Sequence, residues 1–272
     1  MDSYDLLIIK NSINEQVLDL IKQQIPSNKS EVLYLALHTK GGNPDIGFRI
    51  MNLLDSLYKK IYVLVPDKAM STGTLMALGS DKIFMGHSSS LGPLDLQIEH
   101  PTDGSWISTL DIRDTMKTLL SHTEVAAQRL YDQNYLTFGL GKTDAAKFAN
   151  ETAAALIKPV VDKIDPYHLH KSFRGSEVGA KYGSSLLKKR MMRDKDRMAD
   201  LVSSHLANNY ETHGYAIALS EATDLLMLNA EDLNKLELWP EIEKTYLRLD
   251  DGVSYTSKTP AKTNKTDKKS KE

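Results

Sequence analysis

The stretch that decides the fold is VLVPDKAMSTGTLMALGSDKIFMG, residues Val63–Gly86. It opens on an apolar run typical of a buried strand and closes on a second short run, KIFM. An apolar helix is expected between the two runs, over Thr74–Leu78. Ser71 stands at the corner between strand and helix, flanked by the small residues Ala69 and Gly73. A serine with such small neighbours, at the junction of a strand and a helix, is either a helix N-cap or a nucleophile on a strained turn.

The composition is that of an ordinary globular protein, with 272 residues, 41% hydrophobic and 26% charged. The chain has no cysteine, which excludes disulfides, thiol catalysis and cysteine-ligated metal sites. The net charge of −2 gives no reason to expect specific nucleic-acid binding. No run approaches the roughly 20 apolar residues of a membrane span, and the N-terminus is unlike a signal peptide. We therefore expect a cytoplasmic protein with no membrane span, no metal and no cofactor.

Strand and helix patterns alternate through the first hundred residues, which predicts a mainly parallel α/β sheet with right-handed crossovers. VLYLALH is apolar throughout, as expected for a strand buried on both faces of such a sheet. The predicted strands are Asp5–Ile9, Val32–His38, IYVLVP and KIFM, and the predicted helices are Asn14–Ile25, Ile46–Tyr58 and Thr74–Leu78.

The second half of the chain is dominated by helical patterns, over Thr109–Tyr135 and Asp144–Leu206. We expect these helices to form a layer packed on the sheet and not a second independent domain. The segment GYAIALSEATDLLML then resembles a strand followed by a helix with Ser220 as its N-cap.

The predicted organisation is one domain over residues 1–250 followed by a disordered basic tail over 251–272. Within the domain, residues 1–100 are rich in strands, 101–210 form the helical layer, and 211–250 return as strand and helix. The last fifteen residues, KTPAKTNKTDKKSKE, hold six lysines against Asp267 and Glu272 and have no large apolar side chain. Such a composition cannot bury a core.

Gly41 and Gly42 follow the strand Val32–His38, so they lie at the same carboxyl edge of the predicted sheet as Ser71. Glycines allow a substrate to approach the backbone closely, and we expect Gly41 to contribute to substrate binding. The N–H groups of Gly42 and Thr72 are candidates for an oxyanion hole, in which each donor contributes about 3–4 kcal/mol. The alternative is an ordinary glycine turn after a strand.

These residues carry a family resemblance. LHTKGG, AMSTGTLMALGSDKIFMG and LGPLDLQI, in that order, resemble the serine dehydrogenase proteinase family of the ClpP/crotonase superfamily, relatives of signal peptide peptidase A. A later segment, Thr212–Ala218, matches another family motif, with Gly214 in place of its aspartate. The resemblance implies a ClpP/crotonase-like spiral of β-β-α units, Ser71 as nucleophile, Gly42 and Thr72 as oxyanion hole, and homo-oligomerisation.

The general base is not evident from the sequence. Relatives use a Ser-His-Asp triad or a Ser-Lys dyad, and Lys117 is the first lysine after the LGPLDLQ segment, so Lys117 is our predicted base. His100 is the next candidate. His87 and His213 fall in no evident triad pattern, and we expect His213 to hold the late segment against the sheet with Tyr215.

Asp95, in the LGPLDLQ segment, is a further candidate polar residue. We expect it to contribute to the substrate-binding region, either by orienting a base or by bonding main chain at an oligomer contact. The first functional hypothesis is thus a serine peptidase acting on peptides or unfolded segments. The alternatives are a catalytically inactive peptide-binding scaffold and a crotonase-like enzyme acting on acyl-coenzyme A.

Overall fold

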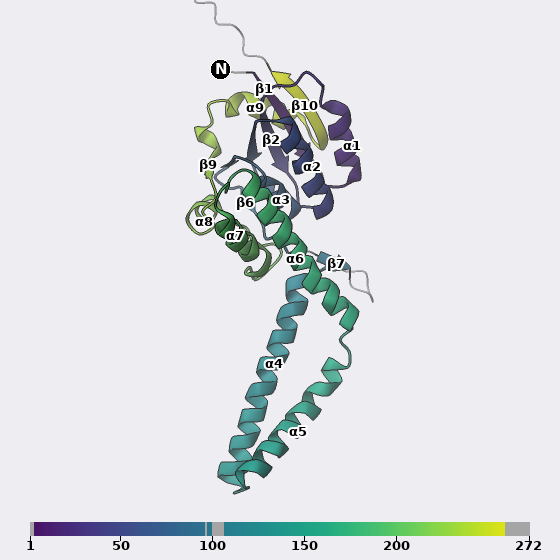
Figure 1. Cartoon of the computed structure of the whole chain (residues 1–272), viewed down its shortest axis with the longest axis vertical. Helices are drawn as coiled ribbons and strands as arrows, with labels where there is room; N and C mark the ends of the chain where they lie inside the picture. The colour runs from purple at the N-terminus through teal and green to yellow at the C-terminus, as the bar shows by residue number, and fades with distance from the viewer. Residues whose placement is uncertain (1–2, 96, 100–105, 259–272) are drawn as a thin grey trace, which may run out of the picture.

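The computed structural model describes residues 3–95, 97–99 and 106–258. Its centre is a six-stranded sheet in the order β10-β1-β2-β3-β5-β9, in which every neighbouring pair is parallel except the antiparallel pair of β10 with β1 (Figure 1). The strands are β1 (Tyr4–Lys10), β2 (Val32–His38), β3 (Lys60–Val65), β5 (Lys82–Met85), β9 (Ala230–Asp232) and β10 (Gly252–Lys258). The predicted parallel α/β sheet is confirmed.

Both faces of the sheet are buried. In β1, Leu7 and Ile9 point into one core, and Leu6 and Ile8 point into the other, as the two-residue period of a strand requires. The first core lies under three helices, α1 (Glu15–Gln24), α2 (Pro44–Leu57) and α3 (Thr72–Leu78). The second core lies under α9 (Trp239–Arg248). This burial on both faces explains why the sequences of the strands are continuous apolar runs.

A second, smaller layer of short extended segments runs beside the main sheet. β4 (Lys68–Ala69) follows β3 and pairs in parallel with β6 (Ser90–Leu91), which follows β5. Isolated bridges continue the layer, Thr39 with Ala69 and Ile13 with Gly42. Each unit therefore supplies a sheet strand, a short segment of the second layer and then a helix. This is the predicted spiral of β-β-α units.

A long helical hairpin projects from the body of the molecule (Figure 1). A small antiparallel ribbon of β7 (Gln97–Glu99) and β8 (Trp106–Ser108) leads into its first helix, α4. The projecting part consists of α4 (Thr109–Asp132), a π-helical turn (Gln133–Thr137) and α5 (Lys142–Val161). The chain then continues into α6 (Pro166–Lys189) and α7 (Asp196–Asn208). Within the described ranges, none of the helices is both long and apolar enough to cross a membrane.

The prediction that this helical half packs on the sheet is wrong for α4 and α5. They extend away from it, and α6 returns to the body (Figure 1). The buried face of α5 consists of small side chains, Ala145, Ala149 and Ala153. Such a narrow face allows close approach of another helix but offers too little apolar area to anchor on a sheet.

Two predictions for the C-terminal part are also wrong. Residues 252–258, predicted to begin the disordered tail, form β10, because Val253 and Tyr255 pack against the core while the backbone pairs with β1. The rest of that tail lies outside the described residues. The expected strand near residue 217 is a single bridge between Ile217 and Leu91. Ser220 is not an N-cap, because α8 (Leu219–Asp224) begins one residue earlier, after Ala218.

Candidate active site

Ser71 occupies a strained corner at the start of α3. Its backbone angles, φ 49° and ψ −112°, lie where non-glycine residues are rarely found. Its side chain makes no capping hydrogen bond to the helix, so the interpretation of Ser71 as a simple N-cap does not fit. The strain holds an uncommitted hydroxyl at the end of a strand and the beginning of a helix, the arrangement of a nucleophile elbow.

Gly41 provides the space that this corner needs. A Cβ atom on Gly41 would stand 3.0 Å from the Ser71 Cβ, and the Gly41 φ of +121° also disfavours a side chain. Gly41 is buried, its N–H donates to Thr39 Oγ1 at 3.0 Å, and its carbonyl accepts from the Ile13 N–H at 2.9 Å. The polar groups of Gly41 are thus bonded within the chain and the residue lets the backbone pass close to Ser71, while its contact with substrate stays a prediction.

Gly42 and Thr72 lie together at the same corner. The Thr72 hydroxyl donates to the Gly42 carbonyl at 2.8 Å, which ties the loop after β2 to the first turn of α3. A Cβ on Gly42 would stand 2.3 Å from the Ile13 carbonyl oxygen, so only glycine fits there. No hydrogen bond between described residues uses the N–H of Gly42 or of Thr72. Both N–H groups therefore lack a hydrogen-bond acceptor among the described residues.

Asp95 and His213 form a hydrogen-bonded pair in which the carboxylate is buried. The Asp95 side chain is fully buried, and its Oδ1 lies 2.9 Å from the His213 Nδ1. Its other oxygen accepts from the Ser108 hydroxyl at 2.6 Å. No part of the carboxylate is exposed, so a contribution of Asp95 to the substrate-binding region would act through the groups that it bonds. Of the roles considered for Asp95, the geometry supports orientation of a histidine.

The segment between α7 and α8 carries His213 to this position. Ile217 exchanges two backbone hydrogen bonds with Leu91, at 3.0 and 2.9 Å, and so fastens the segment to the end of β6. The rings of Tyr210 and Tyr215 pack 4.8 Å apart, and the Tyr210 hydroxyl donates to Glu221 at 2.8 Å. His213 was expected to hold this segment against the sheet. Ile217 does so through the backbone, which leaves the imidazole partly exposed.

Ser71 and His213 line one cavity of about 630 Å³. The N-termini of α1 and α2 also face it, through Asn14 and Asn43, whose side chains cap the two helices. Because Asp95 holds Nδ1 of the imidazole, Nε2 is the ring nitrogen that is free of this contact. A hydroxyl, an imidazole with a buried carboxylate partner, and two unused main-chain donors thus gather at one end of the sheet.

Comparison of the sequence with known protein families identifies the family of this chain. A family model described as ClpP-like SDH-type serine proteinase matches residues 2–156. This chain belongs to that family. The matched part includes Ser71, Gly42, Thr72 and Asp95, and it ends before His213. The chain is thus a member of a ClpP-like serine proteinase family.

Two curated relatives come from Methanocaldococcus jannaschii. The uncharacterized protein MJ0137 is 36% identical over 95 residues, covering 35% of this chain and 32% of that protein. The uncharacterized protein MJ1495 is 39% identical over 64 residues, covering 24% and 22%. The chain therefore spans about a third or less of the length of these relatives.

Solved structures with partial similarity include the 1510-N membrane-bound stomatin-specific protease, at 22% identity and a TM-score of 0.33 over 55% of this chain and 70% of that chain. An enoyl-CoA hydratase from Shewanella pealeana gives 13% identity and a TM-score of 0.28 over 69% and 91%. These TM-scores are low, and the family assignment rests on the sequence match alone.

Lys117, the predicted base, does not lie with Ser71 in this family member. It is on the projecting helix α4, its side chain is 68% exposed, and its ammonium pairs with Asp114 at 3.4 Å. Of the described lysines, Lys40 is the one that lines the Ser71 cavity, and its side chain is exposed. His100 lies outside the described residues. His87 pairs with Asp232 at 3.6 Å and is 79% exposed, away from Ser71.

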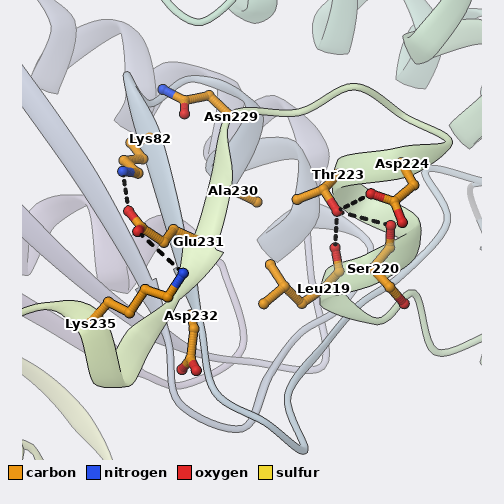
Figure 2. Close-up of a pocket in the computed structure, with 10 residues that line it drawn as sticks. All are labelled: Lys82, Leu219, Ser220, Thr223, Asp224, Asn229, Ala230, Glu231, Asp232 and Lys235. Atoms are coloured by element: carbon orange, nitrogen blue, oxygen red, sulfur yellow. Dashed lines mark hydrogen bonds and ion pairs between the residues drawn. The ribbon is translucent and has the colours of Figure 1, made fainter.

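A second hollow of about 610 Å³ lies beside the edge strand β9 (Figure 2). Lys82 and Lys235 both pair with Glu231 (Figure 2), while Asp232 pairs with His87 outside the hollow. The Thr223 hydroxyl bonds to the backbone of its own helix, α8 (Figure 2). Because these groups satisfy each other, the hollow presents no reactive arrangement comparable with that at Ser71.

Proposed function

We propose that this chain is a serine peptidase that acts through an acyl-enzyme on Ser71, with His213 as general base and Asp95 as the residue that orients it. His213 Nε2 accepts the Ser71 proton as Oγ attacks the scissile carbonyl carbon. The developing oxyanion accepts hydrogen bonds from the N–H groups of Gly42 and Thr72. His213 then gives the proton to the leaving amine. In the second half of the reaction, His213 takes a proton from a water molecule, which attacks the acyl-enzyme and releases the acyl group.

The observation that carries the proposal is the pairing of His213 with a fully buried carboxylate, at the cavity that Ser71 also lines. A carboxylate at Nδ1 fixes the ring orientation and stabilises the imidazolium that forms during proton transfer. Lys117 offers no comparable arrangement, since it is solvated and paired on α4.

We further propose peptides or unfolded segments as substrates, cleaved internally and without ATP. The cavity beside Ser71 is partly open, and its lining includes exposed side chains such as those of Lys40 and Asn43. We also propose that the protein is a homo-oligomer. The projecting hairpin carries large apolar side chains that are more than half exposed, including Leu136, Phe138 and Leu156, and a second copy of the hairpin would cover them.

A fluorophosphonate probe tests the proposal, because it forms a covalent bond only with an activated serine. Labelling of Ser71 in the wild-type protein, and its loss in Ser71→Ala, is the expected result. A folded wild-type protein that resists the probe would instead favour the inactive scaffold. Cleavage of acyl-coenzyme A thioesters by a Ser71→Ala variant would favour the crotonase-like alternative.

A further inference from the structure

We propose that the protease cleaves after small residues, glycine, alanine or serine, because the cavity that receives the side chain on the acyl side of the cleaved bond holds little more than a methyl group. This side chain is called P1 below. The inference rests on the proposed function, in which Ser71 is the nucleophile, and adds the substrate class to it.

Two cavities adjoin Ser71, and they differ in their relation to the base. The larger one is lined by His213, which must hand its proton to the leaving amine. The leaving side of the substrate therefore occupies the larger cavity. The P1 side chain branches from the carbon next to the attacked carbonyl, so it must enter a space that borders Ser71 and the oxyanion hole and that the leaving side does not fill. The smaller cavity borders Ser71 and Thr72.

The smaller cavity has a volume of about 10 Å³. That is close to the minimum that admits one water-sized sphere, and a methyl group is of similar size. Its walls are apolar apart from the two residues at its mouth. The lining residues are Pro44 at the start of α2, Leu75 on α3, Leu94, and Gly179 on α6, together with the two polar residues Ser71 and Thr72.

The walls of this cavity are rigid. A Cβ atom on Gly179 would stand 2.4 Å from the Leu94 carbonyl oxygen, so the backbones of α6 and residue 94 are already in contact there. Leu94 is also held from the other side, because its N–H donates to the Leu206 carbonyl at 2.8 Å. Leu75, which also lines the cavity, is 1% exposed. Closely packed walls of this kind do not open for a larger side chain without moving backbone.

The expected selectivity follows from that rigidity. One methylene too many in a fitted apolar pocket changes kcat/KM by about tenfold or more. A leucine or phenylalanine at P1 exceeds the cavity by several carbon atoms. We therefore expect kcat/KM for alanine at P1 to exceed that for leucine by at least about a hundredfold.

The test uses full-length protein and a set of peptides that differ only at P1, with glycine, alanine, valine, leucine or phenylalanine, and mass spectrometry to locate the cleaved bond. Two enlarging variants, Leu75→Ala and Leu94→Ala, remove the same atoms from two different lining residues. Leu78→Ala is the matched control, since Leu78 is equally buried on α3 but does not line the cavity. Melting temperatures of all three variants verify that they fold.

We expect the ratio of kcat/KM for leucine over alanine to rise at least about tenfold in Leu75→Ala or Leu94→Ala and to stay at the wild-type value in Leu78→Ala. Efficient wild-type cleavage after leucine or phenylalanine would overturn the inference while leaving the proposed function intact. So would an unchanged ratio in both enlarging variants. Failure of the proposed function is recognised separately, by a wild-type protein in which Ser71 neither reacts with a fluorophosphonate nor cleaves any peptide, and that result overturns both.

Discussion

His213 Nδ1 lies 2.9 Å from Asp95 Oδ1, although 118 positions separate the two residues in the chain. The carboxylate is fully buried, and the imidazole stands at the cavity that Ser71 lines. A buried carboxylate without a partner is strongly unfavourable, so the pair is held closed in the folded protein. It gives the site an oriented imidazole, which the lysine on α4 does not replace.

Asp95→Asn tests the orienting role. The amide keeps the shape of the side chain but cannot stabilise an imidazolium, and its NH₂ group favours the wrong tautomer of His213. We expect kcat to fall by about 10²–10⁴-fold with KM little changed. Steady-state kinetics on one peptide provides the measurement. Ser108→Ala is the control, since it removes a partner of the same carboxylate without touching His213, and a loss in kcat as large as that of Asp95→Asn would contradict the account.

Thr72→Val tests the link between Thr72 and Gly42. The variant keeps the volume of the side chain but leaves the Gly42 carbonyl without its 2.8 Å hydrogen bond. A hydrogen bond of this kind contributes about 1 kcal/mol, so we expect kcat to fall about five- to tenfold through a displaced Gly42 N–H. Thr72→Ser restores the hydroxyl and should restore kcat. Equal kcat values in the two variants would show that this bond does not position the oxyanion hole.

Removal of exposed apolar side chains from the hairpin tests the proposed oligomer. Leu136 and Phe138 are 73% and 62% exposed at its tip, so changing both to serine should cost the single chain little stability. We expect the mass measured by light scattering to fall from that of an oligomer to that of one chain. Leu247→Ser, on α9, is an equally exposed control that should keep the wild-type mass. A wild-type protein that is already monomeric would contradict the proposal.

Protonation of Asp5 should account for part of the fall in unfolding free energy at low pH. Burial raises its pKa, but hydrogen bonds from Ser257, Ser30 and Tyr58 outweigh burial and hold the pKa below its ordinary value. The stabilisation is therefore complete above about pH 4 and is lost as the pH falls through the lowered pKa. We expect Asp5→Asn to cost about 2 kcal/mol at pH 7 and to flatten the fall in unfolding free energy below pH 4. Urea unfolding at several pH values measures both. An unchanged acid slope would contradict this role.

The sheet could be predicted from the sequence because its signals are local. The apolar run Val32–His38 and the small residues around Ser71 each determine their own conformation, and the structure has both where they were expected. β10 could not be found in this way. In its sequence, GVSYTSK, apolar and polar residues alternate only weakly, and a lysine-rich segment follows. Its partner β1 lies at the other end of the chain. Here tertiary pairing outweighs local composition.

His213, the base proposed here, was not singled out from the sequence for a related reason. Lys117 was chosen by its order after the LGPLDLQ segment, which says nothing of the direction in which α4 runs. Asp95 and His213 each stood in a recognisable motif, LGPLDLQ and the Thr212–Ala218 segment. The signal that could have joined them is that a buried carboxylate requires a partner, and a histidine in a second motif is a suitable one.

The most direct test of the central claim compares fluorophosphonate labelling rates at Ser71 in four proteins: wild type, His213→Ala, Lys117→Ala and Lys40→Ala. Peptide mapping by mass spectrometry locates the label. If His213 activates Ser71, labelling slows by at least about a hundredfold in His213→Ala and stays near the wild-type rate in both lysine variants. Wild-type labelling in His213→Ala, together with its loss in either lysine variant, would contradict the account and assign the base to that lysine.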